Sequence, residues 1–361
     1  MLISGSTKGG CGMKMKSDLA LGSKVTMKEI ADRLNLSKST VSRAFTRPDL
    51  LDAKTVRRVL NSASRLKFSP NASARALSRG KTHLIAILSP TLNYIMGDFL
   101  TKILLGIQME LEKNDYSIVS CSYENSSGKG EGMFSKVLNR ADVEGALIFA
   151  KSFSETQIEE LASPPVPAVA VDIFSDAIPC VYSDNYQIGC TMAEHIVGMG
   201  HRRIACFMGP DDWDNSVERT RGVFARLKKH GIKVPQDWKG ICRFPFAFTD
   251  SNEKMSSILS SCGPGSRPTA VIAANDEIGI GIYKAAAQHG LSVPGDISVI
   301  GCDNNFFCNY LTPPLTSIEQ SSFDMGTKSA LMLTGKLPAA RLKCKHYVVA
   351  RGSVRKLDAQ L

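Results

Sequence analysis

The spacing of apolar residues changes near residue 83. Before that point, apolar side chains recur at helical intervals in three short stretches, 27–34, 38–45 and 53–66. Beyond it, short apolar runs alternate with longer amphipathic stretches. The first pattern predicts a small all-α domain, and the second predicts a larger α/β region with parallel sheets.

Start signals for three helices punctuate the first region. Thr26 and Glu29 have the spacing of a capping box, in which each side chain satisfies a free N–H at the start of a helix. Ser37 and Asp52 are good N-caps for a second and a third helix. Two short helices joined by a turn, with a third helix that closes the core, predict a helix-turn-helix over residues 25–69.

The face of the second helix that points away from this core is polar. It carries Lys38, Ser39, Ser42 and Arg43. Basic and hydroxylic side chains suit a groove lined by phosphates and base edges better than they suit a partner helix. The pattern therefore favours a DNA-binding domain over an ordinary three-helix bundle.

Charge supports this interpretation. The first 81 residues carry 17 Lys+Arg and 5 Asp+Glu, a net charge of +12, whereas the whole chain has a net charge of +10. The basic excess therefore lies entirely in the first quarter, and a basic face attracts a polyanion such as DNA. The alternative is a disordered basic tail, which the regular apolar spacing disfavours.

Two segments flank this domain. Residues 70–81 form a linker in which Pro70 sets a turn and Leu77 is the one large apolar side chain. A helix this short is marginal alone, so we expect it to order on contact with a partner; packing of Leu77 on the next domain is the alternative. Residues 1–24 contain no signal-peptide core and are expected to be a flexible extension, or to precede the true start.

Length and composition limit the classes of protein to which the chain can belong. The 361 residues suit more than one domain, and no apolar run approaches the ~20 residues of a membrane span. The ten cysteines include no C-x-x-C pair and no Cys/His cluster with zinc spacing, so we expect free thiols, no metal or cofactor and a cytoplasmic location. The roughly 280 residues after 82 favour two lobes with a cleft at the carboxyl ends of the strands.

Several motifs recur in an order and spacing that are specific in combination. They are VTMKEIA at 25–31, SKSTVSR at 37–43, FSPN at 68–71, HIVGMGH at 195–201, AND at 274–276, VPGDISVIGCD at 293–303 and PLTSIEQ at 314–320. On these motifs the chain, from Val25 to about Arg355, resembles the lactose/galactose-repressor family of bacterial transcription regulators. The resemblance implies a helix-turn-helix domain followed by a two-lobed sensing domain like a periplasmic sugar-binding protein.

For DNA, the resemblance implies that the second helix lies in the major groove of an operator. Lys38, Ser39 and Arg43 would read base edges, while Ser37, Thr40 and Ser42 would hold phosphates; Thr26 joins the same DNA-binding set. The linker would be a hinge helix that folds on the operator and inserts Leu77 into the minor groove, with Asn71 and Ala74 beside it. Two such helices meet at the operator centre, which implies a homodimer on a near-palindrome.

For the sensing domain, the resemblance implies three crossovers near residues 183, 312 and 345. Lobe 1 would then comprise about 82–183 and 312–345, and lobe 2 about 184–311 and 346–361. Asp172, Arg219 and Asp276 would surround the effector, with Phe246 as the stacking aromatic among three candidates that include Phe244 and Phe248. Carboxylates and an arginine suit a sugar, sugar acid or sugar phosphate.

These expectations describe an effector-controlled repressor of carbohydrate or sugar-acid genes. One alternative is a global or activating regulator that works with a protein corepressor. A solute-binding protein would share the lobes but lack the DNA-binding domain. An enzyme is disfavoured because the chain has no phosphate-binding loop, no G-x-S-x-G and no H-E-x-x-H motif.

Overall fold

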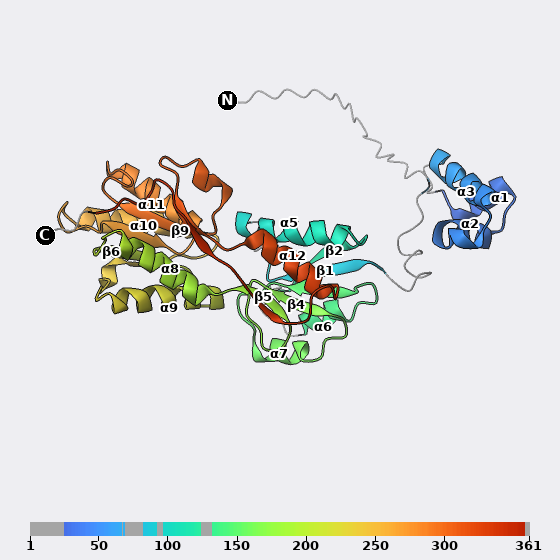
Figure 1. Cartoon of the computed structure of the whole chain (residues 1–361), viewed down its shortest axis with the longest axis horizontal. Coiled ribbons are helices and arrows are strands. Elements are labelled where there is room, and N and C mark those ends of the chain that lie inside the picture. Colours follow the sequence, from blue (N-terminus) through green and yellow to red (C-terminus); the bar gives the residue numbers. More distant parts are fainter. Residues whose placement is uncertain (1–24, 67, 69–81, 92–96, 124–131, 358–361) are drawn as a thin grey trace, which may run out of the picture. The chain divides into compact units, whose positions relative to one another are not determined.

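The computed structural model describes residues 25–66, 68, 82–91, 97–123 and 132–357. The chain divides into two compact units, Met1–Thr82 and His83–Leu361 (Figure 1), and each is described by itself. The predicted extension 1–24 lies outside the described residues, as does the whole of the predicted linker 70–81.

The first unit is helical. It contains α1 (Met27–Leu34), α2 (Lys38–Thr46), the 3-10 helix η1 (Pro48–Leu50) and α3 (Ala53–Arg65). Ile30, Val41 and Val59, one from each α-helix, are fully buried at its centre. The guanidinium of Arg58 donates to the Leu34 carbonyl oxygen at 3.1 Å, which satisfies a free acceptor at the end of α1. The three predicted helices are confirmed.

The second unit contains two six-stranded sheets. The first sheet has the order β11-β5-β4-β3-β1-β2 and is parallel throughout; the second has the order β12-β10-β9-β8-β6-β7 and is parallel except for β12. The first lobe comprises β1 (Leu84–Ser89), α5 (Asp98–Glu112), β2 (Ser117–Ser122), α6 (Met133–Leu138), β3 (Gly145–Ile148), α7 (Glu155–Leu161), β4 (Ala168–Val171), β5 (Cys180–Ser183), α12 (Ser322–Leu333) and β11 (Arg341–Cys344). The second comprises α8 (Asn185–Gly198), β6 (Ile204–Met208), α9 (Asp214–Lys229), η3 (Gln236–Trp238), β7 (Lys239–Ile241), α10 (Ala247–Ser261), β8 (Ala270–Ala273), α11 (Asp276–Gln288), β9 (Ser298–Cys302), η4 (Phe306–Asn309), β10 (Thr316–Glu319) and β12 (Tyr347–Val349).

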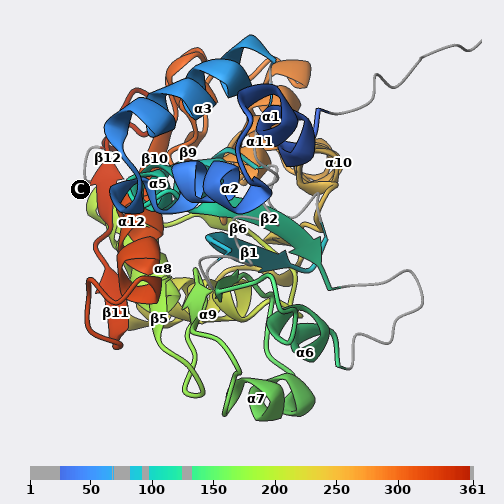
Figure 2. The same cartoon turned by 90° about the vertical axis from the view of Figure 1, so that its right-hand side faces the viewer.

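The first sheet is covered by helices on both faces. Along β1, Ile85 and Ile87 pack toward α5 and α12, while Ala86 and Leu88 pack toward α6 and α7. Figures 1 and 2 show these two helix pairs on opposite sides of the sheet. Because successive side chains of a strand point to opposite faces, a strand covered on both faces must be apolar at every position. This explains why β1, β3 and β4 are continuous apolar runs.

Glycines allow three helix pairs to cross at very short distances. A Cβ on Gly222 of α9 would lie 2.0 Å from the Tyr186 carbonyl oxygen of α8, and one on Gly189 of α8 would lie 2.1 Å from the Arg219 carbonyl oxygen. Gly106 and Gly326 serve the α5–α12 crossing in the same way, and Gly281 serves the α10–α11 crossing. The glycines bring backbone against backbone, so they determine how close the helices lie.

The chain crosses between the lobes after β5, after β10 and after β11. The predicted crossover near 312 is therefore wrong by several residues, because β10 (Thr316–Glu319) pairs with β9 and β12 in the second sheet. Pro313 and Pro314 lie inside the second lobe, in the segment between η4 and β10. The α/β class with a helical N-terminal domain is confirmed, and its strands are parallel except at one edge.

Candidate functional site

The N-terminal ends of α1 and α2 are both capped by side chains. Thr26 and Glu29 form the predicted capping box: the Thr26 N–H donates to Glu29 Oε2 at 2.8 Å, and the Glu29 N–H donates to Thr26 Oγ1 at 3.3 Å. Ser37 caps α2 by accepting the Thr40 N–H at 3.0 Å. The hydroxyls of Ser37 and Ser39 are also hydrogen-bonded, at 2.7 Å. The start of α2 thus presents ordered hydroxyl groups.

The outer face of α2 carries the side chains expected to meet DNA. Lys38, Ser39 and Arg43 are exposed, and Thr40 and Ser42 are half-buried. The opposite face of the helix is buried in the core of the first unit. This side of α2 is therefore free to bind, and it offers two positive charges with hydroxyl donors between them. The remaining DNA-binding candidates, Asn71, Ala74 and Leu77, lie outside the described residues.

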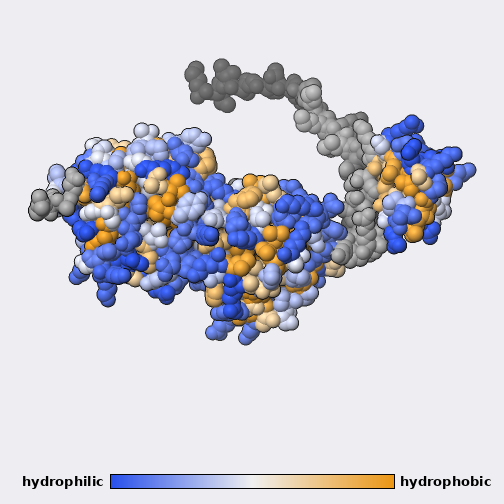
Figure 3. Space-filling model, viewed as in Figure 1, coloured by the Kyte–Doolittle hydropathy of each residue, from blue (hydrophilic) through white to orange (hydrophobic). Residues whose placement is uncertain are grey.

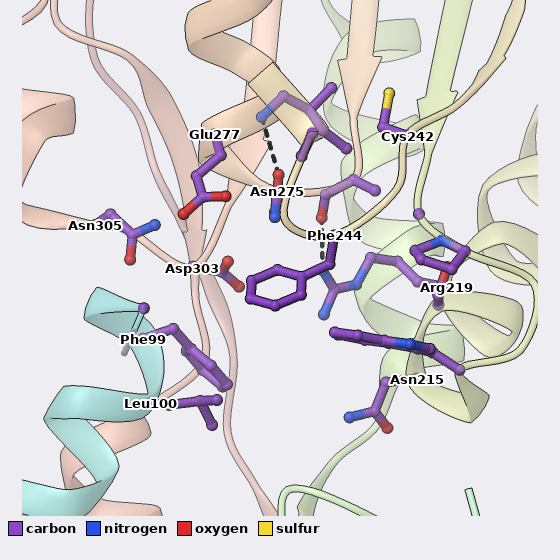
Figure 4. A pocket seen from close by; sticks show the side chains of 18 of the residues that line it. Phe99, Leu100, Asn215, Arg219, Cys242, Phe244, Asn275, Glu277, Asp303 and Asn305 are labelled. Atoms are coloured by element: carbon purple, nitrogen blue, oxygen red, sulfur yellow. Dashed lines mark hydrogen bonds between the residues drawn. The ribbon is translucent and has the colours of Figure 1, made fainter. Parts of the chain in front are cut away.

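A cavity of about 170 Å³ lies between the lobes of the second unit. It is formed at the carboxyl ends of the strands, the edge at which open α/β sheets bind ligands. Segments after β4, β6, β7, β8 and β9 contribute, together with the first turns of α5, α9 and α11 (Figure 4). Both lobes supply lining residues, so a bound molecule would contact both.

Two lining aspartates have an uncommon backbone conformation. Asp172, after β4, has a φ of 59°, and Asp303, after β9, has a φ of 105°. Such left-handed values are strained for residues with a side chain, and strain of this kind concentrates at functional sites. Asp303 Oδ1 accepts a hydrogen bond from Gln320 at 2.7 Å. Asp172 Oδ2 accepts one from Asn215 at 3.2 Å, whereas Asp172 Oδ1 is buried without a partner.

Arg219 lies between these carboxylates but is held by other groups. Its Nε and one terminal nitrogen donate to Asn185 Oδ1 at 3.0 and 2.6 Å, and the other terminal nitrogen donates to the Ala274 carbonyl oxygen at 2.5 Å. Burial opposes the charge of Arg219, but the neighbouring Cys302, Asp303 and Asp172 raise the pKa of its guanidinium. The arginine thus neutralises part of a buried acidic site.

Burial governs the ionisation of the lining carboxyl groups. Loss of hydration raises the pKa of Asp172 to about 7, although the positive charge of Arg219 and the Asn215 hydrogen bond oppose the shift. The same cause raises the pKa of Glu277 and, more strongly, that of Asp303. Several carboxyl groups with raised pKa values around one cavity are typical of a functional site.

Aromatic side chains form one wall of the cavity. Trp213 and Phe244 line it, with ring centroids 5.9 Å apart, and Phe99 approaches from α5 (Figure 4). Phe246, the predicted stacking residue, is not among the lining residues and its side chain is 58% exposed. Phe246 is the N-cap of α10. Of the three phenylalanines that the sequence offers for stacking, Phe244 lines the cavity.

Asp276, another predicted effector-binding residue, lies next to the cavity lining rather than in it. Asp276 is fully buried beneath the cavity and is not one of its lining residues. Its Oδ1 accepts from the Ser317 hydroxyl at 2.6 Å and its Oδ2 accepts from the Asn305 N–H at 2.8 Å, so both oxygens are occupied. The neighbouring Glu277 faces the cavity instead. Asp276 therefore positions the segment that carries Asn305.

Sequence reasoning missed Asp303, Trp213 and Asn215. Asp303 had a usable signal, because it follows a continuous apolar strand and thus falls at the binding edge of the sheet. Trp213 is one of two tryptophans in the chain and follows the strand-like run Ile204–Met208. Nothing local marks Asn215, whose role depends on its amide reaching Asp172 across the lobes.

Among the described residues no helix combines the length and the hydrophobicity needed to cross a bilayer. In the view of Figure 3 polar side chains predominate on the surface of the second unit, with apolar patches on both lobes.

Comparison with protein families assigns both units. Residues 26–71 match the model of bacterial regulatory proteins of the lacI family, and residues 193–355 match that of the periplasmic binding protein-like domain. The first match covers α1, α2 and α3. The second match covers most of the second lobe together with α12 and β11, which belong to the first lobe.

Individual relatives span nearly the whole chain. The HTH-type transcriptional repressor CytR of Escherichia coli K12 is 28% identical over 344 residues, covering 92% of this chain and 97% of the relative. The ribose operon repressor of the same strain is 28% identical over 336 residues, covering 91% and 99%. The fold matches the crystal structure of the lac repressor dimer bound to operator and the anti-inducer ONPF with a TM-score of 0.79, at 24% identity and with coverage of 92% and 99%.

Proposed function

The chain belongs to the lacI family of bacterial regulatory proteins, whose members are DNA-binding transcription regulators, and we propose that it represses genes of carbohydrate metabolism under the control of a small sugar-like effector. The observation that carries the proposal is that one chain combines two sites. The first is the exposed face of α2, and the second is the cavity between the lobes. We assign binding, and not catalysis, to both sites. We place the protein in the cytoplasm, where it would meet both DNA and the effector.

On the DNA, we assign base reading to Lys38, Ser39 and Arg43. They are the exposed polar side chains on the first two turns of α2, and an arginine fork pairs well with guanine. Thr26, Ser37, Thr40 and Ser42 are assigned to phosphate contacts. Thr26 and Ser37 are the N-caps of α1 and α2 and Thr40 lies in the first turn of α2, where anions are favoured; Ser42 follows in the second turn. Residues 70–81 are proposed as the hinge helix, with Asn71 and Ala74 beside the wedge residue Leu77.

We propose that the regulator acts as a homodimer on a near-palindromic operator. In support, η4 and its C-cap expose two aromatic side chains, Phe306 at 61% and Tyr310 at 79%, with ring centroids 6.3 Å apart. Exposed aromatic pairs of this kind are enriched at protein interfaces. A relative with the same fold is a dimer bound to operator.

In the cavity, we assign effector contact to Asp172 and Arg219 as predicted from the sequence, and we add Asp303, Glu277 and Phe244. Two similar proteins point to sugars: one is named the ribose operon repressor, and the solved structure of a LacI family transcriptional regulator from Enterococcus faecium carries bound ribose. Hydroxyl groups donate well to carboxylates, and an apolar sugar face stacks on aromatic rings.

The proposal is tested by selecting binding sites from random duplex DNA with the purified full-length protein. We expect enrichment of one near-palindromic sequence and, on adding the effector, a change in affinity for that sequence measured by fluorescence anisotropy. Enrichment that requires an added protein partner would favour the corepressor alternative. Recovery of random sequence only would contradict the proposal.

A further inference from the structure

Two helices of the second lobe begin with an N–H group whose acceptor lies in the first lobe. Phe306 is the first residue of η4, and its N–H donates to Asp98 Oδ2 at 2.9 Å. Asp214 is the first residue of α9, and its N–H donates to the Lys151 carbonyl oxygen at 2.9 Å. The first N–H groups of a helix have no acceptor within that helix. Both bonds therefore exist only while the two lobes lie close together.

These two contacts lie on opposite sides of the cavity. Figure 4 shows Phe99 and Leu100, at the start of α5, on one side and Asn215, at the start of α9, on the other. Closure of the lobes is thus recorded at two separate places. A change that opens the lobes as a whole must break both contacts, whereas a local change breaks only one.

Lys102 adds a charged bond on the α5 side. It lies one turn after Asp98 and forms an ion pair with it at 3.1 Å, and its Nζ donates to the Asn304 carbonyl oxygen at 2.7 Å. The two α5 side chains, here called the α5 clasp, thus bind one carbonyl group and one N–H group of the segment 304–306. Hydrogen bonds that involve a charged group are stronger than those between neutral groups.

The segment that the α5 clasp binds is itself fixed within the second lobe. The Asn304 N–H donates to Ser317 Oγ at 3.0 Å, and its Nδ2 donates to Glu319 Oε2 at 2.8 Å. Its Oδ1 accepts from Arg351 at 2.6 Å. Asn304 has a φ of 48° and follows Asp303, whose φ is 105°. Left-handed residues of this kind persist only where their surroundings fix them, so the clasp holds the lobe as a body and not a loose loop.

The α5 clasp is partly shielded from solvent. The side chains of Lys102 and Asp98 are 28% and 21% exposed. A matching ion pair lies on α12 of the same lobe, where Lys328 and Asp324 also stand four residues apart, but these side chains are 37% and 53% exposed. Solvent weakens an exposed pair more than a shielded one. Of the two clasp residues only Asp98 lines the cavity, so Lys102 can be changed without altering the cavity wall.

We propose that the α5 clasp holds the two lobes closed in the absence of any ligand, and that Lys102 is the positioning residue that sets the equilibrium between closed and open lobes. Three crossovers join the lobes, and two bodies joined in this way can turn about their connections. Breaking the clasp therefore lets both sides of the cavity open together. The proposal concerns the second unit alone and does not rest on the function proposed above.

The test measures hydrogen exchange of single amides in the full-length protein, without ligand or DNA and at a fixed protein concentration. An amide that is bonded across the lobes exchanges when they separate, so its rate follows the open population. Lys102→Met removes the donor and keeps the aliphatic side chain. We expect the amides of Phe306 and Asp214 to exchange about tenfold faster, by similar factors. Mass spectrometry with residue-level fragmentation gives both rates.

Matched variants separate opening of the lobes from a general defect. Lys102→Arg keeps a charged donor and should restore slow exchange at both amides. Lys328→Met removes the α12 ion pair and should change neither amide. The amide of Val271, in the buried strand β8, reports unfolding and should keep its rate in every variant.

Asp98→Asn is a second, milder variant. It keeps an acceptor for the Phe306 N–H but removes the charge that pairs with Lys102. We expect the same two amides to exchange faster by up to about fivefold, because the ion pair is only partly shielded. If Val271 exchanges faster in Lys102→Met, which would indicate unfolding, the comparison of amides in Asp98→Asn decides instead.

The position of the faster exchange decides the outcome. Faster exchange at Phe306 alone would overturn the proposal, because Lys102 would then fix only a local contact. Unchanged rates at both amides would overturn it as well. Operator affinity is measured in parallel on the duplex enriched in the selection experiment. If both amides exchange faster while operator affinity stays the same, the clasp stands and control of DNA binding by the lobes fails.

Discussion

At the scale of single residues, Asp172 combines a strained backbone with a buried, half-satisfied carboxyl group. Burying a carboxyl group without a full set of hydrogen-bond partners costs free energy. The stability of the ligand-free protein therefore does not explain this arrangement. A ligand that donates a hydrogen bond to the unpaired Oδ1 of Asp172 would offset this cost. The free energy of unfolding should therefore change as the carboxyl group of Asp172 ionises.

Replacing Asp172 by asparagine should flatten the pH dependence of stability. An aspartate in an unfolded chain titrates near ~3.9, whereas burial raises the folded pKa of Asp172 to about 7. Between these values the folded state holds a proton that the unfolded state has lost, so stability falls as pH rises from about 4 to about 7. Urea unfolding across this range checks the prediction. The control Asp142→Asn should keep the full slope, because the pKa of Asp142 is lowered.

Arg43 on α2 provides a second test at this scale. Removing an arginine that reads a base should lower the preference for operator over random DNA by about ten- to a hundredfold, since a bidentate pair is worth ~1–3 kcal/mol. Arg57→Ala is the matched control, because Arg57 is an exposed arginine on α3. Anisotropy titrations with both duplexes give the ratio. Equal losses in the two variants would mean that Arg43 contributes charge but not base reading.

At the scale of elements, the α8–α9 crossing links packing to the cavity. Arg219 is carried by α9, and its carbonyl oxygen faces Gly189 of α8. The Asn185 side chain at the start of α8 receives two hydrogen bonds from the same arginine. A change in the distance between these helices must therefore move the guanidinium.

Gly189→Ala should destabilise the protein and weaken effector binding together. The new methyl group would lie 2.1 Å from a backbone oxygen, so the helices must separate, at a cost of about 1–3 kcal/mol. Gly198→Ala is the control, because no atom lies within 4 Å of a Cβ at this position of the same helix. Chemical denaturation and calorimetry measure the two effects. A stable Gly189→Ala variant with normal binding would show that the crossing tolerates expansion.

At the scale of the whole molecule, the proposed function requires the two units to bind different ligands and the two binding events to be coupled. If the effector changes operator affinity by some factor, the operator must change effector affinity by the same factor, because the coupling free energy is shared. For regulators of this kind the coupling is typically ~1–3 kcal/mol, or about 5- to 150-fold.

Measuring how each ligand changes the affinity for the other tests whether the cavity and α2 form one switch. Operator affinity is measured with and without saturating effector, and effector affinity with and without operator duplex. We expect equal factors on the two sides, both different from one. Factors of one on both sides would mean that the cavity ligand does not control DNA binding.

The sequence alone determined the features that depend on local chemistry. Thr26, Ser37 and Asp52 cap their helices as predicted, because a hydroxyl or carboxylate at an N-cap satisfies backbone groups within three residues. The buried strands were also recognisable, because a sheet covered on both faces requires continuous apolar runs. The family motifs then supplied the two-unit order of the chain.

Only the tertiary structure decided which side chains meet in the cavity. Asp276 and Glu277 are adjacent and both acidic, yet helical geometry buries the first against Ser317 and turns the second toward the cavity. Phe244 and Phe246 differ by two residues, yet only Phe244 lines it. Short polar strands such as β11 (Arg341–Cys344) depend on their neighbours in the sheet rather than on their own pattern. Contacts between residues far apart in the chain depend on packing, which local sequence does not encode.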